Sequence, residues 1–154
     1  MRKVLLTAAA SLAAATLFAA PAMAGEGRIE LDTGLAYNND SAVKSSIGGA
    51  IGYDVNITPN AFIGVEESID KVLASGYEVR WGSTGRIGAR LPVIGKAYAL
   101  AGYTYGVGPD GAHVGGGIEH PFGPLYGKVE YRHYFLHDGN RDANQVLFGA
   151  GVHF

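Results

Sequence analysis

Polar and apolar residues alternate along most of the chain beyond residue 27. In RIELDTGLAY (28–37) the odd-numbered positions are mostly apolar, and the even-numbered positions carry the charges. SSIGGAIGYDV (45–55) and LYGKVEYRHYF (125–135) repeat this pattern. A period of two places successive side chains on opposite faces of an extended strand. After residue 24 no window of 11 residues has convincing helical periodicity. The pattern therefore predicts an all-β protein.

Turn-forming residues divide the alternating runs into eight predicted strands. Short connections with Pro, Gly or Asn occur at 56–62, 91–96 and 120–125, and more polar ones at 38–44, 70–83, 106–111 and 137–143. The strands are expected near 28–37, 45–55, 61–69, 84–91, 97–105, 112–119, 125–136 and 144–154, and residues 77–81 also alternate and could extend the fourth. Strands of this length can cross a bilayer on a tilt, and short turns alternating with longer loops are typical of outer-membrane barrels. We therefore expect an eight-stranded antiparallel up-and-down transmembrane β-barrel.

The charged face of these strands is expected to line the barrel interior. A soluble β-sandwich or a lipocalin-like barrel would instead bury the apolar face. The charged face is rich in glycine, which weakens a strand but suits a narrow bore. Opposite charges in such a bore can pair with one another. The predicted lumen charge network comprises Glu30, Asp32, Glu66, Arg86, Arg90, Glu119, Lys128, Glu130 and Arg132.

The apolar face is then expected to contact lipid. Its members are Ile29, Leu31, Leu35, Ile47, Ile51, Ile63, Val65, Ile87, Leu91, Val114, Ile118, Val129, Val146 and Val152. Aromatic residues near strand ends are assigned to the interfacial girdles: Tyr37, Tyr53, Tyr98, Tyr103, Tyr105, Tyr131, Phe135 and Phe154. Glu67 breaks the pattern, because it falls on the lipid face. It must lie at the outer rim, or the register must shift by one residue there.

The first 24 residues have the layout of a cleaved secretory signal peptide. Arg2 and Lys3 precede an apolar stretch over 4–20, and Ala22-Met23-Ala24 forms an A-x-A cleavage site. A retained membrane helix is the alternative, although a span of mostly alanine is weak. We expect export through the Sec pathway and one barrel domain over 25–154. That domain would carry ten Lys and Arg residues against fourteen Asp and Glu, so a nucleic acid is not an expected partner. It contains no cysteine, so its interior or the surrounding lipid must hold it together.

Longer stretches resemble a known family. They are YDVNITPNAFIGVEESI (53–69), GRIGARLPVIGKAYALAGYTYG (85–106), GGGIEHPFGPLYGKVEYRHYF (115–135) and NQVLFGAGVHF (144–154). In order and spacing they resemble the small opacity-protein/OmpA-like outer-membrane β-barrels of Gram-negative bacteria. The resemblance implies a place in the outer membrane with both termini in the periplasm. It also implies a structural role or a surface-interaction role of the adhesion or opacity type. The partners it implies are outer-membrane lipid around the barrel and a possible extracellular ligand at the loops.

The end of the chain is similar to the signal read by the barrel-assembly machinery. In that comparison Gly149, Val152 and Phe154 match, whereas Phe148 stands where the signal prefers a polar residue. The connection at 106–111 is short for the family, which weakens the case for a ligand held by long loops.

We predict no catalytic, cofactor-binding or metal site. GVGPDG (106–111) matches G-x-G-x-x-G, but a dinucleotide site needs a helix there, and Pro-Asp-Gly favours a turn. The five histidines lack metal-binding spacing. His133 and His137 flank the last loop beside Asp138 and Asp142, an arrangement that does not require a metal.

Two other functions remain as alternatives. The charged bore could conduct ions as a narrow porin-like channel, although bores of this size are usually filled by side chains. A lipid A deacylase-like enzyme would need a serine two residues after the lipid-facing His133, and Phe135 stands there. Ser83 and Thr84 have no base partner recognisable from the sequence.

Overall fold

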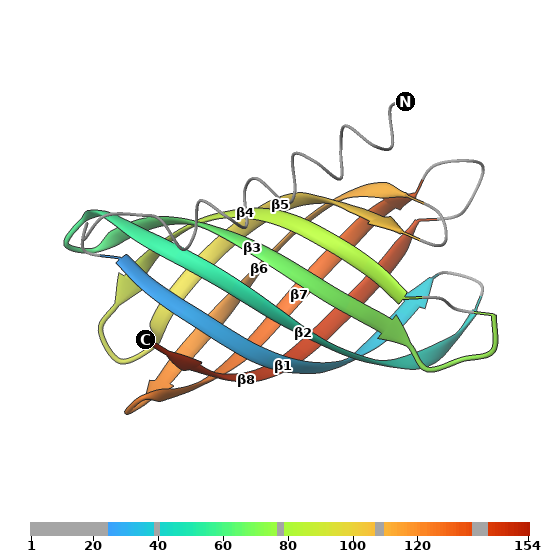
Figure 1. Cartoon of the computed structure of the whole chain (residues 1–154), viewed down its shortest axis with the longest axis horizontal. Helices are drawn as coiled ribbons and strands as arrows, with labels where there is room; N and C mark the ends of the chain where they lie inside the picture. Colours follow the sequence, from blue (N-terminus) through green and yellow to red (C-terminus); the bar gives the residue numbers. More distant parts are fainter. Residues whose placement is uncertain (1–24, 39–40, 77–78, 107–109, 137–141) are drawn as a thin grey trace.

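Eight antiparallel strands close into a single barrel in the computed structural model (Figure 1). The structure describes residues 25–38, 41–76, 79–106, 110–136 and 142–154, so the predicted signal peptide lies outside the described residues. The strands are β1 (Gly25–Asn38), β2 (Ser41–Thr58), β3 (Ala61–Val72), β4 (Val79–Leu91), β5 (Gly95–Gly106), β6 (Gly111–Phe122), β7 (Leu125–Leu136) and β8 (Ala143–His153). Each strand pairs with its neighbours in the chain, and β8 pairs with β1.

The predicted fold class is confirmed: the barrel is all-β, antiparallel and up-and-down. Each of the eight predicted strands corresponds to an observed one, because side-chain alternation is a local property of an extended chain. No helix long and apolar enough to cross a bilayer occurs in the described parts of the chain.

Several strands extend beyond their predicted ends, and 70–83 is the largest difference. The prediction assigned this range to a polar loop and left open that residues 77–81 extend the fourth strand; β3 continues to Val72, and β4 does begin earlier, at Val79. Asp70 pairs in register with Arg80, and both occupy the inward-facing positions of their strands. Polar residues therefore mark the wall of this barrel as well as its loops, because the barrel interior is itself polar.

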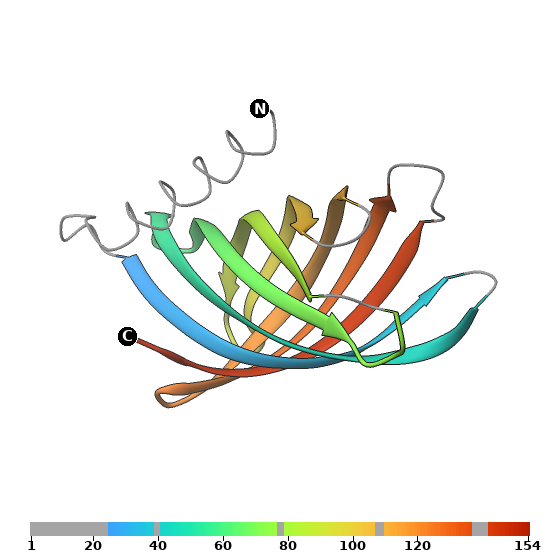
Figure 2. The ribbon, with the colours of Figure 1, turned by 45° about the vertical axis from the view of Figure 1, so that its right-hand side comes forward.

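The two ends of the barrel differ in their connections. At one end, here called the turn end, strands are joined through residues 59–60, 92–94 and 123–124, and both Gly25 and Phe154 lie there. The other end, called the loop end, is where β1 ends and β2 begins, β3 ends and β4 begins, β5 ends and β6 begins, and β7 ends and β8 begins (Figures 1 and 2). At the turn end Gly123 adopts φ 71°, a left-handed conformation that glycine accepts without strain.

The barrel is charged inside and apolar outside. Among the described residues, buried polar and charged side chains outnumber buried apolar ones, and the buried apolar cluster contains only Phe62, Tyr98 and Leu100. On the outer wall large apolar side chains are exposed, Leu31 by 77% and Ile87 by 58%. This distribution is the reverse of that in a soluble protein and is the one expected of a barrel in lipid.

The assignment of Tyr98 to an interfacial girdle was wrong. Tyr98 points into the bore, is only 6% exposed, and donates a hydrogen bond of 2.7 Å to Glu130. It shares an inward position with Lys96 and Leu100, so the alternation already placed it inside. Proximity to a strand end does not distinguish a girdle tyrosine from one in the bore.

Neither expectation for Glu67 is met. The register runs without a shift from Ile51↔Glu67 to Glu67↔Ser83, so the side chain stays on the outer wall. It is also not at the rim, because the outward pairs Ile69↔Trp81 and Lys71↔Val79 lie between it and the end of the strand. Glu67 is a carboxyl group within the apolar belt.

Glycine on the inner wall makes room for charged side chains. At Gly52 an added Cβ would lie about 2.5 Å from the guanidinium carbon of Arg28, which is itself buried. On the outer wall, the nearest atom to a Cβ added at Gly85 is the Ala101 carbonyl oxygen, at 3.8 Å. The same substitution should therefore destabilise the barrel at Gly52 and have little effect at Gly85.

We predict that Gly52→Val lowers the free energy of unfolding by about 1–3 kcal/mol, because the bore is already full and Arg28 must move. Gly85→Val, the matched control, should change it by less than about 0.5 kcal/mol. Urea unfolding in detergent micelles, followed by tryptophan fluorescence, measures both. Equal effects at the two positions would contradict a tightly filled bore.

Candidate functional site

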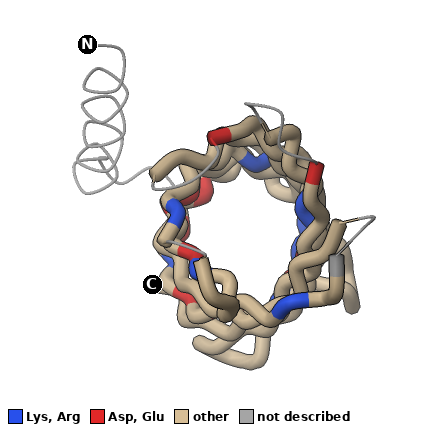
Figure 3. Tube along the Cα trace, turned by 90° about the vertical axis from the view of Figure 1, so that its right-hand side faces the viewer, with Lys and Arg blue, Asp and Glu red and all other residues tan. Residues whose placement is uncertain are grey.

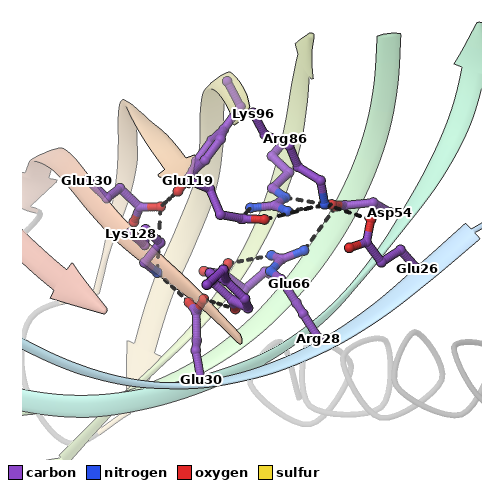
Figure 4. Close-up of polar contacts among 12 residues, drawn as sticks. Glu26, Arg28, Glu30, Asp54, Glu66, Arg86, Lys96, Glu119, Lys128 and Glu130 are labelled. Carbon is purple, nitrogen blue, oxygen red and sulfur yellow. Dashed lines mark hydrogen bonds and ion pairs between the residues drawn. The ribbon is translucent and has the colours of Figure 1, made fainter. Parts of the chain in front are cut away.

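A continuous network of buried ion pairs fills the bore (Figure 4). It begins at Arg28 on β1, whose Nη1 donates to Asp54 Oδ1 at 2.9 Å and whose Nη2 donates to Glu66 Oε2 at 2.6 Å. All three side chains are almost completely buried. Charges removed from water in this way need partners, and here each partner is another charged side chain.

Asp54 on β2 is the hub of the half of the network nearest the turn end. Arg86 binds it through two nitrogens, Nε at 2.8 Å from Oδ1 and Nη2 to Oδ2, in the bidentate geometry that makes arginine–carboxylate pairs strong. Lys96 Nζ lies 2.9 Å from Oδ2. With Arg28, three cations surround this single carboxylate.

Two carboxylates, Glu26 and Glu119, extend that half of the network to the opening at the turn end. Lys96 Nζ lies 3.0 Å from Glu26 and 3.4 Å from Glu119. The His153 ring places Nδ1 2.9 Å from Glu26 and Nε2 2.9 Å from Glu119. These groups and Arg90 line a recess of about 290 Å³ at the turn end.

Lys128 and Arg132 on β7 hold the other half of the network together. Lys128 Nζ contacts Glu30 and lies 3.3 Å from Asp32 Oδ1. Glu30 also accepts a hydrogen bond from the Tyr126 hydroxyl. Arg132 binds Glu130 through Nε and Glu66 through Nη2, the latter at 2.6 Å. Because Glu66 is shared with Arg28, the two halves form one network.

Some of these pairs cross the full width of the bore. Strands four apart lie on opposite walls of an eight-stranded ring, whose closed outline Figure 3 shows along the barrel axis. Lys96 on β5 pairs with Glu26 on β1, and Arg132 on β7 pairs with Glu66 on β3. Opposite walls are therefore joined directly by side chains at two places.

Uncharged polar groups form a second layer nearer the loop end. His113 is buried between two hydroxyls, with Thr84 Oγ1 2.9 Å from Nε2 and Thr104 Oγ1 3.0 Å from Nδ1. Gln145 donates to Ser46 Oγ at 2.8 Å and accepts from the Tyr134 hydroxyl at 2.7 Å. Both groups are enclosed and bonded on each side, which is the arrangement of interior packing.

All nine residues of the predicted lumen network point into the bore, and the structure brings them into contact. Arg90 is the outlying member, because its side chain is 35% exposed at the turn end. The prediction left out four charged residues that belong to the network: Glu26, Arg28, Asp54 and Lys96. Arg28 and Asp54 already lay on the charged face of their strands. Glu26 and Lys96 precede the expected strand starts, so alternation was not applied to them.

The candidate enzyme residues have other contacts. His133 faces outward with Nδ1 2.9 Å from Asn144 Oδ1 and its ring edge-on to Phe135, 4.6 Å between centroids. The hydroxyl of Thr84 does meet a histidine in space, but within the bonded interior layer. Ser83 Oγ instead donates to Glu67 at 2.9 Å.

No group of three metal-binding side chains occurs among the residues that the structure describes. His137 and Asp138 lie outside them, as does the middle of GVGPDG. The described ends of that motif are Gly106, which closes β5, and Gly111, which opens β6, so strands flank it on both sides.

Solved structures of small outer-membrane barrels share this fold. The N-terminal β-barrel domain of Pseudomonas aeruginosa OprF has a TM-score of 0.61 at 14% identity, covering 84% of this chain and 99% of that one. Ail, the attachment invasion locus protein of Yersinia pestis, has a TM-score of 0.62 at 12% identity, covering 84% and 97%. Neisserial surface protein A has a TM-score of 0.57 at 13% identity, covering 84% of this chain and 97% of that one. At these identities the likeness is one of fold. No protein-family model and no curated protein matches the sequence.

We predict that Arg132→Met lowers the free energy of unfolding by about 3–5 kcal/mol, because Glu130 and Glu66 lose a buried partner. Arg90→Met, the control, removes a partly exposed pair with Glu26 and should cost less than about 1 kcal/mol. Urea unfolding in micelles measures the difference. Similar losses for both variants would show that the cross-bore pair carries no special weight.

Proposed function

We propose that this chain is an outer-membrane β-barrel of the opacity-protein/OmpA-like type, with a plugged lumen and a structural or surface-interaction role. The observation that supports the plug is the pairing of opposite walls by Lys96 with Glu26 and by Arg132 with Glu66. Side chains bonded across the bore leave an ion no continuous aqueous path at those levels. The same groups would have to separate for the barrel to conduct.

The outer wall supports residence in a membrane. Its apolar side chains would be costly to expose to water over so large a continuous surface. The closed sheet supports it as well, because a spanning segment in lipid must satisfy its backbone groups internally. The fold shared with OprF, Ail and Neisserial surface protein A supports the outer membrane as the membrane in which the chain resides.

The two ends suggest an orientation. Bacterial barrels of this kind have short turns on the periplasmic side and longer loops outside. The turn end, with Gly25 and Phe154, would therefore face the periplasm, after export through the Sec pathway and cleavage following Ala24. The loop end would face the exterior.

The loops favour a structural role over recognition of a large ligand. At the loop end the strands are separated by the ranges 39–40, 73–78, 107–110 and 137–142, which are short for ligand-binding loops. Ail is by its name an attachment and invasion protein, and an adhesive role here would have to use these modest connections and the adjoining strand ends.

Cell fractionation and gel migration test the location. We expect the protein in the outer-membrane fraction, migrating faster on a denaturing gel before heating than after, because a closed barrel resists detergent until it is boiled. Recovery in the periplasmic extract would contradict the proposal, since a soluble barrel would have its polar face outside.

Planar-bilayer recordings separate the plug from a channel. Arg132→Ala and Arg86→Ala should each raise the conductance, because Arg132 is bonded across the bore and Arg86 fills the bore between Asp54 and Glu119. Arg90→Ala, at the open turn end, is the control and should leave it unchanged. A wild-type conductance as large as that of the variants would instead favour the narrow porin-like channel.

The last strand carries the proposed assembly signal, Gly149, Val152 and Phe154. The Phe154 backbone closes the barrel through two hydrogen bonds with Gly27, of 2.8 and 2.9 Å, while its ring is 73% exposed on the outer wall.

We predict that Phe154→Ala reduces the amount of barrel in the outer membrane, because it removes the exposed ring and keeps the backbone bonds. Immunoblots of outer-membrane fractions measure this, with Phe122→Ala, another exposed aromatic at the turn end, as the control. Equal membrane levels for Phe154→Ala and the wild type would rule out a role for the ring in assembly.

A further inference from the structure

Glu67 places a carboxyl group on the outer wall below the aromatic residues of the loop end. Its neighbours on the same face of β3 are Val65 and Ile69, and its side chain is half-buried. The next outward pairs toward the loop end contain Trp81 and Tyr105, which face each other across β4 and β5. Aromatic residues at this end mark the headgroup level. Glu67 thus lies on the apolar wall beside these aromatic residues, in contact with the Tyr105 hydroxyl.

Only one of its two oxygens is bonded within the protein. Ser83 Oγ donates to Oε2 at 2.9 Å, and the Tyr105 hydroxyl donates to the same atom at 3.4 Å. The two hydroxyls are themselves 3.3 Å apart, so they form a closed triangle with Oε2. Oε1 accepts no hydrogen bond from any residue that the structure describes. In lipid an unpartnered carboxyl oxygen is costly, and an ionisable residue there points to a function.

An apolar groove begins at this carboxyl group. It is shallow and open, has a volume of about 770 Å³, and is lined by residues of β1, β2, β3, β4, β7 and β8. Its larger lining side chains are Ile29, Leu31, Ile51, Ile69, Trp81 and Val152. An open apolar groove with one polar group at its edge suits an amphiphile lying along the wall better than a ligand that needs an enclosed pocket.

We propose that this groove binds the acyl chain of a membrane lipid, and that Glu67 recognises a hydroxyl group on that chain. The proposal rests on the proposed residence in a membrane, where acyl chains already surround the wall. The groove would hold the chain against Ile51 and Ile69, and the chain hydroxyl would bond Oε1. The triangle of Ser83, Tyr105 and Oε2 fixes the carboxyl group so that Oε1 is turned to the lipid.

A hydroxyl is the group that satisfies Oε1 in both of its states. It can donate to a carboxylate, and it can accept from the protonated acid. An ester carbonyl can only accept, so it serves only the protonated acid, and a plain hydrocarbon chain serves neither state. The position of Glu67 beside the aromatic residues that mark the headgroup level also requires the hydroxyl to lie near the head of the chain.

Trp81 provides a local reporter, because it lines the groove and is the single tryptophan of the chain. The purified barrel is reconstituted into phosphatidylcholine vesicles containing one of two brominated lipids. These lipids are identical except that one carries a hydroxyl at the third carbon of its acyl chain. We expect half-maximal quenching of Trp81 at about a fivefold lower fraction of the hydroxylated lipid, the effect of one hydrogen bond.

Glu67→Leu keeps the groove apolar and removes the carboxyl group that would bind the chain hydroxyl. In this variant both lipids should quench with the weaker affinity of the plain lipid. The matched control is Ile87→Leu, which lies on the same outward face of β4 as Trp81 but outside the groove. This variant should keep the fivefold preference for the hydroxylated lipid. Unaltered heat-dependent migration on a gel shows that each variant is folded.

Equal quenching of the wild type by the two lipids would overturn the proposal, as would a preference that survives in Glu67→Leu. Weak quenching by both lipids, together with cross-linked dimers, would also overturn it, because a second copy of the chain would then cover the groove. The proposed function has its own test in cell fractionation. A protein found in the outer membrane but without lipid preference would contradict the lipid site alone.

Discussion

Closure of the sheet between β8 and β1 is the constraint from which the other features follow. Ten residue pairs in continuous register join these two strands, and the Phe154 backbone adds bonds to Gly27. Each strand then has both of its edges paired, which is the condition for a sheet to exist in lipid without unbonded backbone groups. A ring of eight strands also fixes the bore at a width that side chains can span. What fills the bore and what faces outward are then decided residue by residue.

The narrow bore turns a set of charges into one network. Taken singly, Arg28, Asp54 or Arg132 would be unfavourable in an interior, because removing a charge from water costs several kcal/mol. Each is tolerated because at least two opposite charges lie within bonding distance. Such pairs add little net stability compared with apolar packing, but breaking one leaves an unpaired buried charge. The network therefore joins walls that the closed ring already places opposite each other, and glycines such as Gly52 provide the space that it occupies.

The outer wall follows the opposite rule and contains an informative exception. Apolar side chains cover it from the turn end to the aromatic residues near the loop end. Within this belt the carboxyl group of Glu67 is held by hydroxyls from two neighbouring strands, which places a polar contact where the surroundings offer none. Most interior charges face an oppositely charged side chain, although Arg28 Nε and Asp32 Oδ1 have no hydrogen-bond partner among the described residues. Glu67 differs in its surroundings, because it lies on the apolar wall and its described partners are two hydroxyl groups.

The order of residues along the chain determined the strands, their two faces and the all-β class. These depend on alternation and turn chemistry, which act over a few residues. The inward position of Tyr98 was contained in the same alternation and was missed because strand ends were given more weight. Only the tertiary structure decided that Arg132 meets Glu66, that Lys96 meets Glu26 and that Glu67 meets Tyr105. These contacts join strands that are distant in the chain, and they depend on the stagger and closure of the whole ring. Alternation tells which side of the wall a residue occupies, but only closure brings opposite walls together.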